Sequence, residues 1–515
     1  MSNQPIELLE TSELPTEFAD LLRRNLDQDA DHKSALGQYL TPVQIARFLA
    51  SLFESIDGEV RLLDPGAGVG ALTAAFVEEA CGRKKRPMSI HASVYELDSA
   101  LEGSLSKTMA KCGKLCQSHG IQFSSTIIIG DFIELTTSQL SNCLFESSTP
   151  SFTHVIMNPP YKKIRSDSST RKQLRKAGIE TSNLYTAFMS LAQHLIEESG
   201  QFVSITPRSF CNGPYFKSFR HSFLDAMRLK RAHLFESRKD AFKEDAVLQE
   251  NVVLAADRGV HAQRDRVLIT SSYRSCDEET TSRIAPYNDV ISPSDADRFI
   301  HLATDDAGAI VSQRVGRLVS NLVDAGVSVS TGRVVDFRAK EHLRREPDDE
   351  TLPLLYPCNI SQSGINWPRS DTKKPQSLAD CEETRKLLVP SGYYVLVKRF
   401  TTKEEAKRIV ACVFDPNVIN ADRVGFENHL NYFHCDGSPM PKVLAVGLAT
   451  FLNSTAVDMF FRQFNGHTQV NATDLRNMRY PSQEQLKSIG KRMIFRKYFD
   501  VKIADEVVGE VLGWN

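Results

Sequence analysis

The sequence predicts an α/β protein in which a Rossmann-like, doubly wound and mostly parallel sheet of seven strands is followed by a second domain of mixed α+β structure. Short apolar runs alternate with helical stretches from about residue 60 to residue 257, and a glycine-rich turn follows the first of these runs. Residues 274–298 are polar and contain two prolines, which is typical of a linker or of surface loops. Beyond them the alternation is lost, so we expect two domains of different architecture.

One helix is expected to precede the sheet and pack on it. Thr41 and Pro42 suit its cap and first position, and apolar residues recur at helical spacing from Val43 to Ile56. The last two strands are expected to form a closing antiparallel pair. The seven expected strands cover residues 60–64, 90–96, 123–131, 153–157, 201–206, 231–236 and 250–257. The expected division of the chain is an N-terminal helical segment (1–36), a first domain (37–265) and a second domain (266–515).

The overall composition is that of a globular protein. Hydrophobic residues make up 41% and charged residues 24% of the 515 residues, and the net charge of −2 leaves room for a local basic surface. The N-terminus is acidic and no apolar run reaches the ~18 residues of a membrane span, so we expect a cytoplasmic protein without a membrane partner. The ten cysteines are scattered, and Cys112, Cys116 and His119 lack a fourth ligand. We therefore expect reduced thiols and no metal.

The first three strands each end in a feature of nucleoside recognition. Residues 62–76 (LLDPGAGVGALTAAF) read as an apolar strand, the acidic Asp64 and then a glycine-rich turn that opens a helix and can lie close to a ligand. The second strand ends at Glu96, where a carboxylate can accept hydrogen bonds from both hydroxyls of a ribose. The third strand ends at Asp131 and Phe132, which suit the amino group and the ring of an adenine. Together these strand ends predict a nucleoside site.

The fourth strand runs directly into Asn158-Pro159-Pro160-Tyr161. Pro159 has no backbone donor and Pro160 restricts the residue before it, so the strand must stop and turn. In open α/β sheets ligands bind outside the carboxyl ends of the strands, which is where Asn158 and Tyr161 are presented. A simple strand terminator is the alternative for the tetrapeptide alone. The nucleoside features before it favour a catalytic role.

In this order the motifs resemble those of S-adenosylmethionine-dependent DNA amino-methyltransferases, specifically the gamma-type N6-adenine enzymes of restriction-modification systems, whose cofactor motif precedes the catalytic NPPY motif. The segments GQYLTP (37–42) and SNLYTAFM (182–189) match two further parts of that family, and the motifs cover about residues 37–257. The resemblance implies a methyltransferase sheet and S-adenosylmethionine as the cofactor. It also implies double-stranded DNA as the partner, with a separately encoded restriction endonuclease as a further partner acting on the same site.

The resemblance also assigns roles to residues. The side-chain oxygen of Asn158 and the carbonyl of Pro159 would accept the two hydrogens of the adenine amine, which favours the pyramidal nitrogen that reacts. Tyr161 would stack on the base after it leaves the duplex. Phe216 is expected to stack on the other face, with Tyr215 as the second choice, although Phe216 also fits a helix core. Cytosine-N4 relatives usually carry Ser in place of Asn158, which favours adenine.

Two sets of residues follow from the resemblance. The implied catalytic residues are Asn158, Pro159, Pro160, Tyr161 and Phe216. The implied cofactor residues are Tyr39, Thr41, Asp64, Pro65, Gly66, Ala67, Gly68, Gly70, Glu96, Leu97, Asp131, Phe132 and Asn158.

Two stretches are expected to contact DNA. Residues 162–176 hold seven Lys or Arg against one acid directly after the catalytic turn, which suits phosphates, although a solvated face has the same pattern. Residues 464–481 carry side chains that can read base edges. The alternative for this stretch is a helix cap at Asn471 or Thr473 that opens an amphipathic helix. Residues 427–434 are expected to belong to the same surface. The second domain is therefore expected to recognise the target. The expected contacts are Lys162, Lys163, Arg165, Arg171, Lys172, His467, Gln469, Asn471 and Arg476.

Other functions remain open at this point. The same catalytic turn occurs in enzymes that methylate a glutamine of release factors and in some ribosomal-RNA methyltransferases, which are typically smaller and lack a second domain of this size. A non-catalytic DNA-binding specificity subunit is disfavoured because every motif position is filled.

Overall fold

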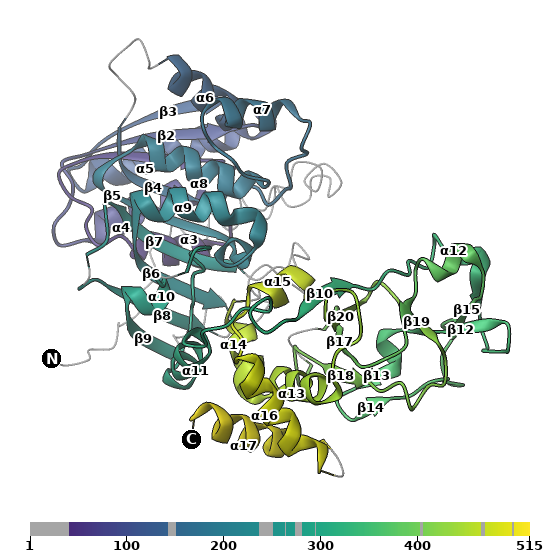
Figure 1. Ribbon diagram of the computed structural model, residues 1–515. Helices are drawn as coiled ribbons and strands as arrows, with labels where there is room; N and C mark the ends of the chain where they lie inside the picture. Colours follow the sequence, from purple (N-terminus) through teal and green to yellow (C-terminus); the bar gives the residue numbers. More distant parts are fainter. Residues whose placement is uncertain are drawn as a thin grey trace. The chain divides into compact units, whose positions relative to one another are not determined.

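The computed structural model describes residues 41–142, 151–235, 251–262, 264–272, 281–293, 295–401, 405–464, 469–496 and 499–514, so the expected N-terminal helical segment lies outside it. The chain divides into two compact units, Met1–Thr304 and Asp305–Asn515, and each is described by itself (Figure 1). The expected boundary near residue 265 was wrong, because β8 (Arg266–Ser272), β9 (Thr281–Pro286) and α10 (Tyr287–Val290) belong to the first unit. β9 is a partly buried edge strand, so its polar sequence lacks the apolar pattern of the other strands.

The first unit is built on a sheet of nine strands in the order β3-β2-β1-β4-β5-β7-β6-β8-β9. All seven expected strands are present, and β8 and β9 raise the count from seven to nine. Neighbours among β1 to β5 pair in parallel, whereas β7 is antiparallel to β5 and to β6. The antiparallel pairing of β6 with β7 confirms the expected closing pair. The bounds are β1 Glu59–Pro65, β2 Ser89–Glu96, β3 Gln122–Ile129, β4 Phe152–Met157, β5 Ile196–Pro207, β6 Met227–Phe235 and β7 Asn251–Arg258.

Helices cover both faces of this sheet, and two separate apolar cores result (Figure 1). One core contains α3 (Val43–Ser51), α4 (Ala71–Gly82) and α5 (Glu102–Ser118). The other contains α6 (Phe132–Asn142), α8 (Leu184–Leu195) and α9 (Lys217–Ala226), while the short α7 (Ser169–Lys176) precedes α8. Along β4, Ile156 joins the first core and its neighbours Val155 and Met157 join the second, as expected for a strand buried on both faces.

The start of α3 differs from the expectation in one detail. Pro42, and not Thr41, occupies the N-cap position, and no side chain of the described residues caps this helix. The Thr41 hydroxyl is therefore not used by the helix that follows it.

Parallel pairing brings the ends of several strands to one edge of the sheet. Pro65 of β1 lies opposite Tyr95 of β2, and Met157 of β4 lies opposite Ser204 of β5. We call this the carboxyl edge, and it presents Asp64, Glu96, Asn158 and Ile205.

The second unit combines three small sheets with helices, which is a mixed α and β structure. The four-stranded sheet has the order β10-β20-β17-β18, with bounds β10 Ser328–Thr331, β17 Tyr394–Lys398, β18 Ala411–Phe414 and β20 Leu430–His434. The five-stranded sheet has the order β11-β15-β12-β19-β16, with bounds β11 Leu343–Arg344, β12 Thr351–Leu355, β15 Ser377–Ala379, β16 Val389–Pro390 and β19 Arg423–Phe426. The remaining elements are β13 Ile360–Ser361, β14 Gly364–Ile365, α11 Asp306–Gly316, α12 Glu382–Arg385, α13 Lys442–Asn453, α14 Thr455–Phe464, α15 Ala472–Asn477, α16 Gln483–Ile494 and α17 Val501–Leu512.

Among the residues that the structure describes, no single helix has the length and apolar character to cross a membrane. One bent pair, Lys442–Asn453 with Thr455–Gln463, passes this test by length and composition when its two helices are taken together.

Candidate active site

The glycine-rich turn after β1 has a backbone that only glycine adopts easily. Gly66, Gly68 and Gly70 have φ angles of 79°, 58° and 86°. A Cβ atom on Gly70 would lie 2.9 Å from the Thr108 side chain, so α5 also packs too closely for any other residue. The N–H groups of Gly66 and Ala67 donate to the Tyr95 carbonyl at 2.9 and 2.8 Å. The turn is thereby fixed to the end of β2.

Asp64 presents a buried carboxylate oxygen beneath this turn. One oxygen, Oδ2, accepts a hydrogen bond from the Thr73 hydroxyl at 2.7 Å, whereas Oδ1 is buried and has no hydrogen-bond partner among the residues that the structure describes. Burial raises the pKa of Asp64 to about 7, although the hydrogen bonds from Thr73 oppose the shift. An unpaired buried oxygen of this kind is costly unless a ligand supplies a donor.

Glu96 holds the same turn from the end of β2. Its Oε2 accepts from the Gly68 N–H at 2.8 Å and its Oε1 accepts from the Asp98 N–H at 2.8 Å. Burial raises the pKa of Glu96, while these backbone hydrogen bonds lower it. Asp64, the glycine turn and Glu96 are therefore brought together, with the exposed Leu97 directly beside them.

The third strand end is arranged differently from the expectation. Asp131 Oδ1 accepts from the N–H groups of Ile133 and Glu134, at 2.8 and 3.4 Å, and so caps α6. The Phe132 ring is buried edge-on to Tyr95 and tilted against Phe188, with centroid distances of 5.0 Å to each. Cofactor roles for Asp131 and Phe132 stay predictions, and both residues also serve the fold.

The Asn158 side chain is anchored at both ends. Its Nδ2 group donates to the Thr41 hydroxyl at 3.0 Å, and its Oδ1 accepts from the Tyr161 hydroxyl at 2.8 Å. The Tyr161 hydroxyl also lies 3.2 Å from the Ile205 carbonyl at the end of β5. The sequence indicated Thr41 as a cofactor residue, whereas the structure places its hydroxyl on Asn158. Tyr39, from the same segment, lies outside the described residues.

A row of aromatic rings leads away from Tyr161. The Tyr185 ring lies 6.3 Å from Tyr161 and 5.7 Å from Phe216, measured between centroids. Burial raises the pKa of Tyr185, and its hydroxyl is 2.8 Å from the Ser209 hydroxyl. Sequence analysis did not single out Tyr185, although its motif was noted. Phe216 is buried in this row, whereas Tyr215 is 80% exposed.

The basic run after the catalytic turn is only partly exposed. Lys162, Lys163, Arg165 and Lys172 are exposed, as a phosphate contact requires. Arg171 and Arg175 both pair with Glu180, and the Arg171 side chain is only 13% exposed. The hydrogen bond from Arg175 lowers the pKa of Glu180. The charge of Arg171 in α7 is thus compensated by Glu180, which follows this helix.

In the second unit the two expected polar segments approach each other. The Arg399 guanidinium donates to the Gln469 side chain at 3.4 Å and to the Asn428 carbonyl at 3.2 Å. Asn471 is the N-cap of α15, and its N–H donates to Asp474 at 3.1 Å, which is the capping role that the sequence left open. Arg476 is exposed on α15, and His467 lies outside the described residues.

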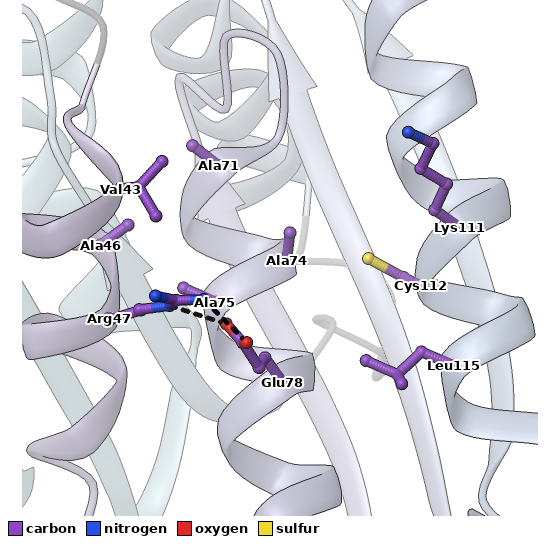
Figure 2. A pocket seen from close by; sticks show the side chains of 10 residues that line it. All are labelled: Val43, Ala46, Arg47, Ala71, Ala74, Ala75, Glu78, Lys111, Cys112 and Leu115. Carbon is purple, nitrogen blue, oxygen red and sulfur yellow. Dashed lines mark hydrogen bonds and ion pairs between the residues drawn. The ribbon is translucent and has the colours of Figure 1, made fainter. Parts of the chain in front are cut away.

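A small cavity of about 30 Å³ lies between α3, α4 and α5 (Figure 2). Arg47 and Glu78 point toward one another there and form two hydrogen bonds of 3.0 Å. The remaining lining is mainly alanine, leucine and valine, with Lys111 and Cys112 on the α5 side. This space suits about one water molecule and contains none of the predicted site residues.

Comparisons with known proteins agree on one kind of relative. The family model "Eco57I restriction-modification methylase" matches residues 108–242. The type II methyltransferase M.PstI of Providencia stuartii is 42% identical over 488 residues, which are 95% of this chain and 95% of that protein. The type II methyltransferase M.BsuBI of Bacillus subtilis is 44% identical over 481 residues, which are 93% of this chain and 94% of that protein.

Proposed function

Because the chain belongs to the type II restriction-modification DNA methyltransferases, we propose that it transfers a methyl group from S-adenosylmethionine to the N6 amine of an adenine flipped out of duplex DNA. The observation that carries this proposal is the Asn158 amide, held at both ends at the carboxyl edge beside the glycine-rich turn. A separately encoded restriction endonuclease would cleave the same site when it is unmethylated.

The first strand ends fit the cofactor. S-adenosylmethionine supplies an electrophilic methyl group. The unpaired Oδ1 of Asp64 is an acceptor for a cationic or N–H donor of the ligand, and the glycine turn leaves room for close approach of the backbone. The Glu96 carboxylate lies at the end of β2 against the glycine turn, where it is proposed to accept hydrogen bonds from the hydroxyls of a ribose.

The Asn158 oxygen is proposed to activate the target amine. The lone pair of this amine is delocalised into the adenine ring, so the amine is a poor nucleophile. Asn158 Oδ1 and the Pro159 carbonyl would each accept one of its hydrogens and favour the pyramidal nitrogen. Oδ1 also accepts from the Tyr161 hydroxyl, which holds it at the carboxyl edge.

Thr41 is proposed as a positioning residue for this amide and not as a cofactor ligand. The two ends of an amide have the same shape, but only the oxygen can accept a hydrogen from the substrate. The Asn158 amide donates to the Thr41 hydroxyl and accepts from the Tyr161 hydroxyl. Thr41 and Tyr161 therefore hold the amide side chain in place at the carboxyl edge.

The flipped base would stack on Tyr161. Phe216 is the preferred second ring, because Tyr185 connects it to Tyr161 within one aromatic row, whereas nothing packs Tyr215 into that row. Lys162, Lys163, Arg165 and Lys172 would meet phosphates beside the site.

Methyl transfer from radiolabelled S-adenosylmethionine to duplex DNA, RNA and protein, assayed side by side, tests the proposal. We expect label in duplex DNA and N6-methyladenine in its hydrolysate. Label in RNA or protein alone would assign one of the alternative amino-methyltransferase functions, N4-methylcytosine would refute the choice of base, and no label with any substrate would favour a specificity subunit.

A further inference from the structure

Three segments of the second unit meet at one end of its four-stranded sheet. Thr331 lies opposite Asn431, and Lys398 lies opposite Leu430. These pairs mean that β10 ends, β17 ends and β20 begins at the same end of the sheet. Residues that are far apart in sequence are therefore neighbours there.

Four side chains gather at this end, Arg399, Phe400, His429 and Gln469, and we call them the strand-end cluster. Arg399 and Phe400 directly follow β17, and His429 directly precedes β20. Gln469 is paired with Phe400 in an antiparallel bridge. The rings of Phe400 and His429 are 4.9 Å apart, and the Arg399 guanidinium carbon is 5.9 Å from the Phe400 ring centroid.

The backbone beneath the cluster is tightly connected. The Arg399 N–H donates to the His429 carbonyl at 2.9 Å, and the Arg399 carbonyl accepts from the Val470 N–H at 2.7 Å. A Cβ atom on Gly332 would lie 2.1 Å from the Glu427 carbonyl oxygen, so this strand passes directly against the turn that carries His429. The cluster is thus held on hydrogen-bonded backbone, as a recognition surface requires.

His429 is oriented by a buried acid. The Glu427 side chain is only 1% exposed and its carboxylate bonds to the His429 Nδ1, while it also accepts from the His429 N–H at 2.9 Å. The imidazole itself is 46% exposed, and Nε2 is on the side of the ring away from Nδ1. Phe400 beside it is 43% exposed.

We propose that the strand-end cluster is a contact surface for the DNA duplex, with Phe400 and His429 as its specificity-determining residues. The cluster offers guanidinium, imidazole and amide groups, which match the acceptors and donors of base edges and phosphates, and a ring for apolar contact with a thymine methyl group. The cluster itself contains no acid, and the neighbouring Glu427 carboxylate is buried against His429. This inference rests on the proposed function and names the surface that reads its DNA substrate.

The test uses the full chain and one duplex. Single-molecule sequencing of DNA from cells that express the protein first locates the methylated site, and a duplex carrying that site is the probe. We compare the wild-type protein with Phe400→Ala and with His429→Ala. The measured quantities are the Kd of the duplex, kcat and KM, and the rate of methylation of single-mismatch duplexes. Phe495→Ala is the matched control, because Phe495 is 87% exposed and lies at the C-terminal end of α16, outside the cluster.

We expect Phe400→Ala and His429→Ala each to raise KM for the duplex about 10-fold or more and to weaken discrimination against mismatches. The Kd for S-adenosylmethionine and the thermal midpoint should stay at the wild-type values, as should all constants of Phe495→Ala. His429→Ala can lower the thermal midpoint because it exposes Glu427. In that case Phe400→Ala, which changes an exposed side chain, still tests the inference. DNA binding and discrimination like those of wild type in Phe400→Ala would overturn the inference. Failure of the wild-type protein to methylate DNA would instead refute the proposed function.

Discussion

The two units present their functional residues in different ways. On the carboxyl edge of the first unit each important residue lies at the end of a strand or directly after it, so chain order already predicts that Asp64, Glu96 and Asn158 are neighbours. In the second unit the strand-end cluster combines residues from three separate segments at the ends of short strands. A parallel sheet with regular crossovers makes sequence order informative about space, whereas antiparallel strands joined by long connections do not.

The largest expected effect tests the carboxyl edge. Asn158→Ala removes the proposed acceptor for the target amine, so methyl transfer should fall about 100- to 1,000-fold, in the range known for the loss of an oriented polar group in the transition state. Calorimetry should show an unchanged Kd for S-adenosylmethionine, because the Asn158 side chain is held by Thr41 and Tyr161 and is proposed to act on the target amine. Near-wild-type turnover would remove Asn158 from the mechanism.

Truncation separates the two units. A fragment of residues 1–304 retains the whole nine-stranded sheet and should unfold cooperatively and bind S-adenosylmethionine while losing site-specific methylation. A fragment of residues 1–269 cuts β8 and lacks β9, which leaves β6 at an open edge, and we expect it to aggregate. Circular dichroism melting compares the two. Equal stability of both fragments would instead support a domain boundary near residue 265.

Asp64 should give the first unit a distinctive pH dependence. Its folded pKa of about 7 lies above the ordinary 3.8, so the folded state holds a proton that the unfolded state releases. Stability is therefore lost as pH rises from about 4 to about 7, by up to about 4 kcal/mol relative to Asp64→Asn. Denaturant unfolding of both proteins across this range measures the difference. Parallel stability curves would show that Asp64 is ionised in the folded protein.

Thr41→Val keeps the shape of the side chain and removes the hydroxyl that receives Asn158. We expect kcat to fall about 10- to 100-fold, as for the loss of one buried hydrogen bond, with an unchanged Kd for S-adenosylmethionine. Thr41→Ser should restore most of the rate, which a loss of packing alone would not explain. Weaker binding of S-adenosylmethionine with an unchanged kcat would instead support the expected role of Thr41 as a cofactor residue.

The smallest expected effect concerns the basic run. Lys162→Ala/Lys163→Ala should flatten the salt dependence of DNA binding, by a slope change of about 0.9 for each phosphate that is no longer neutralised. Lys107→Ala/Lys114→Ala on α5 carries the same change in charge and serves as the control. Binding titrations at several salt concentrations compare the two. If both double variants showed the same salt dependence of DNA binding, Lys162 and Lys163 would belong to a solvated surface without a phosphate contact.

Sequence reasoning succeeded where local pattern and final position coincide. Most of the first seven strands are buried and read as apolar runs, and the more exposed β3 still ends in the apolar run 127–129. β9 is polar and exposed along much of its length, and it was missed together with the buried β8, so the domain boundary was placed before both strands. The capping of α15 by Asn471 and Asp474 is local and was recognised as an option. In the second unit several strands are only two or three residues long, too short to show a period.

Contacts between distant segments were out of reach. Thr41 and Asn158 are 117 residues apart, and nothing in the spacing indicates that one hydroxyl serves the other amide. Tyr185 and Phe216 share a ring contact across the start of α8 and the turn before α9, and Arg399 reaches Gln469 across 70 residues. Such pairs depend on how the sheets are assembled, which the residue types alone do not specify.

The hydrogen bonds around Asn158 have a consequence for biosynthesis. Thr41 leaves the ribosome well before Asn158 is made, and Ile205, whose carbonyl lies beside the Tyr161 hydroxyl, is made later still. A nascent chain that ends before β5 therefore carries every cofactor motif and the tetrapeptide itself, yet lacks the Ile205 carbonyl that lies beside the Tyr161 hydroxyl. Translation must therefore pass β5 before the contacts around the proposed catalytic amide are complete.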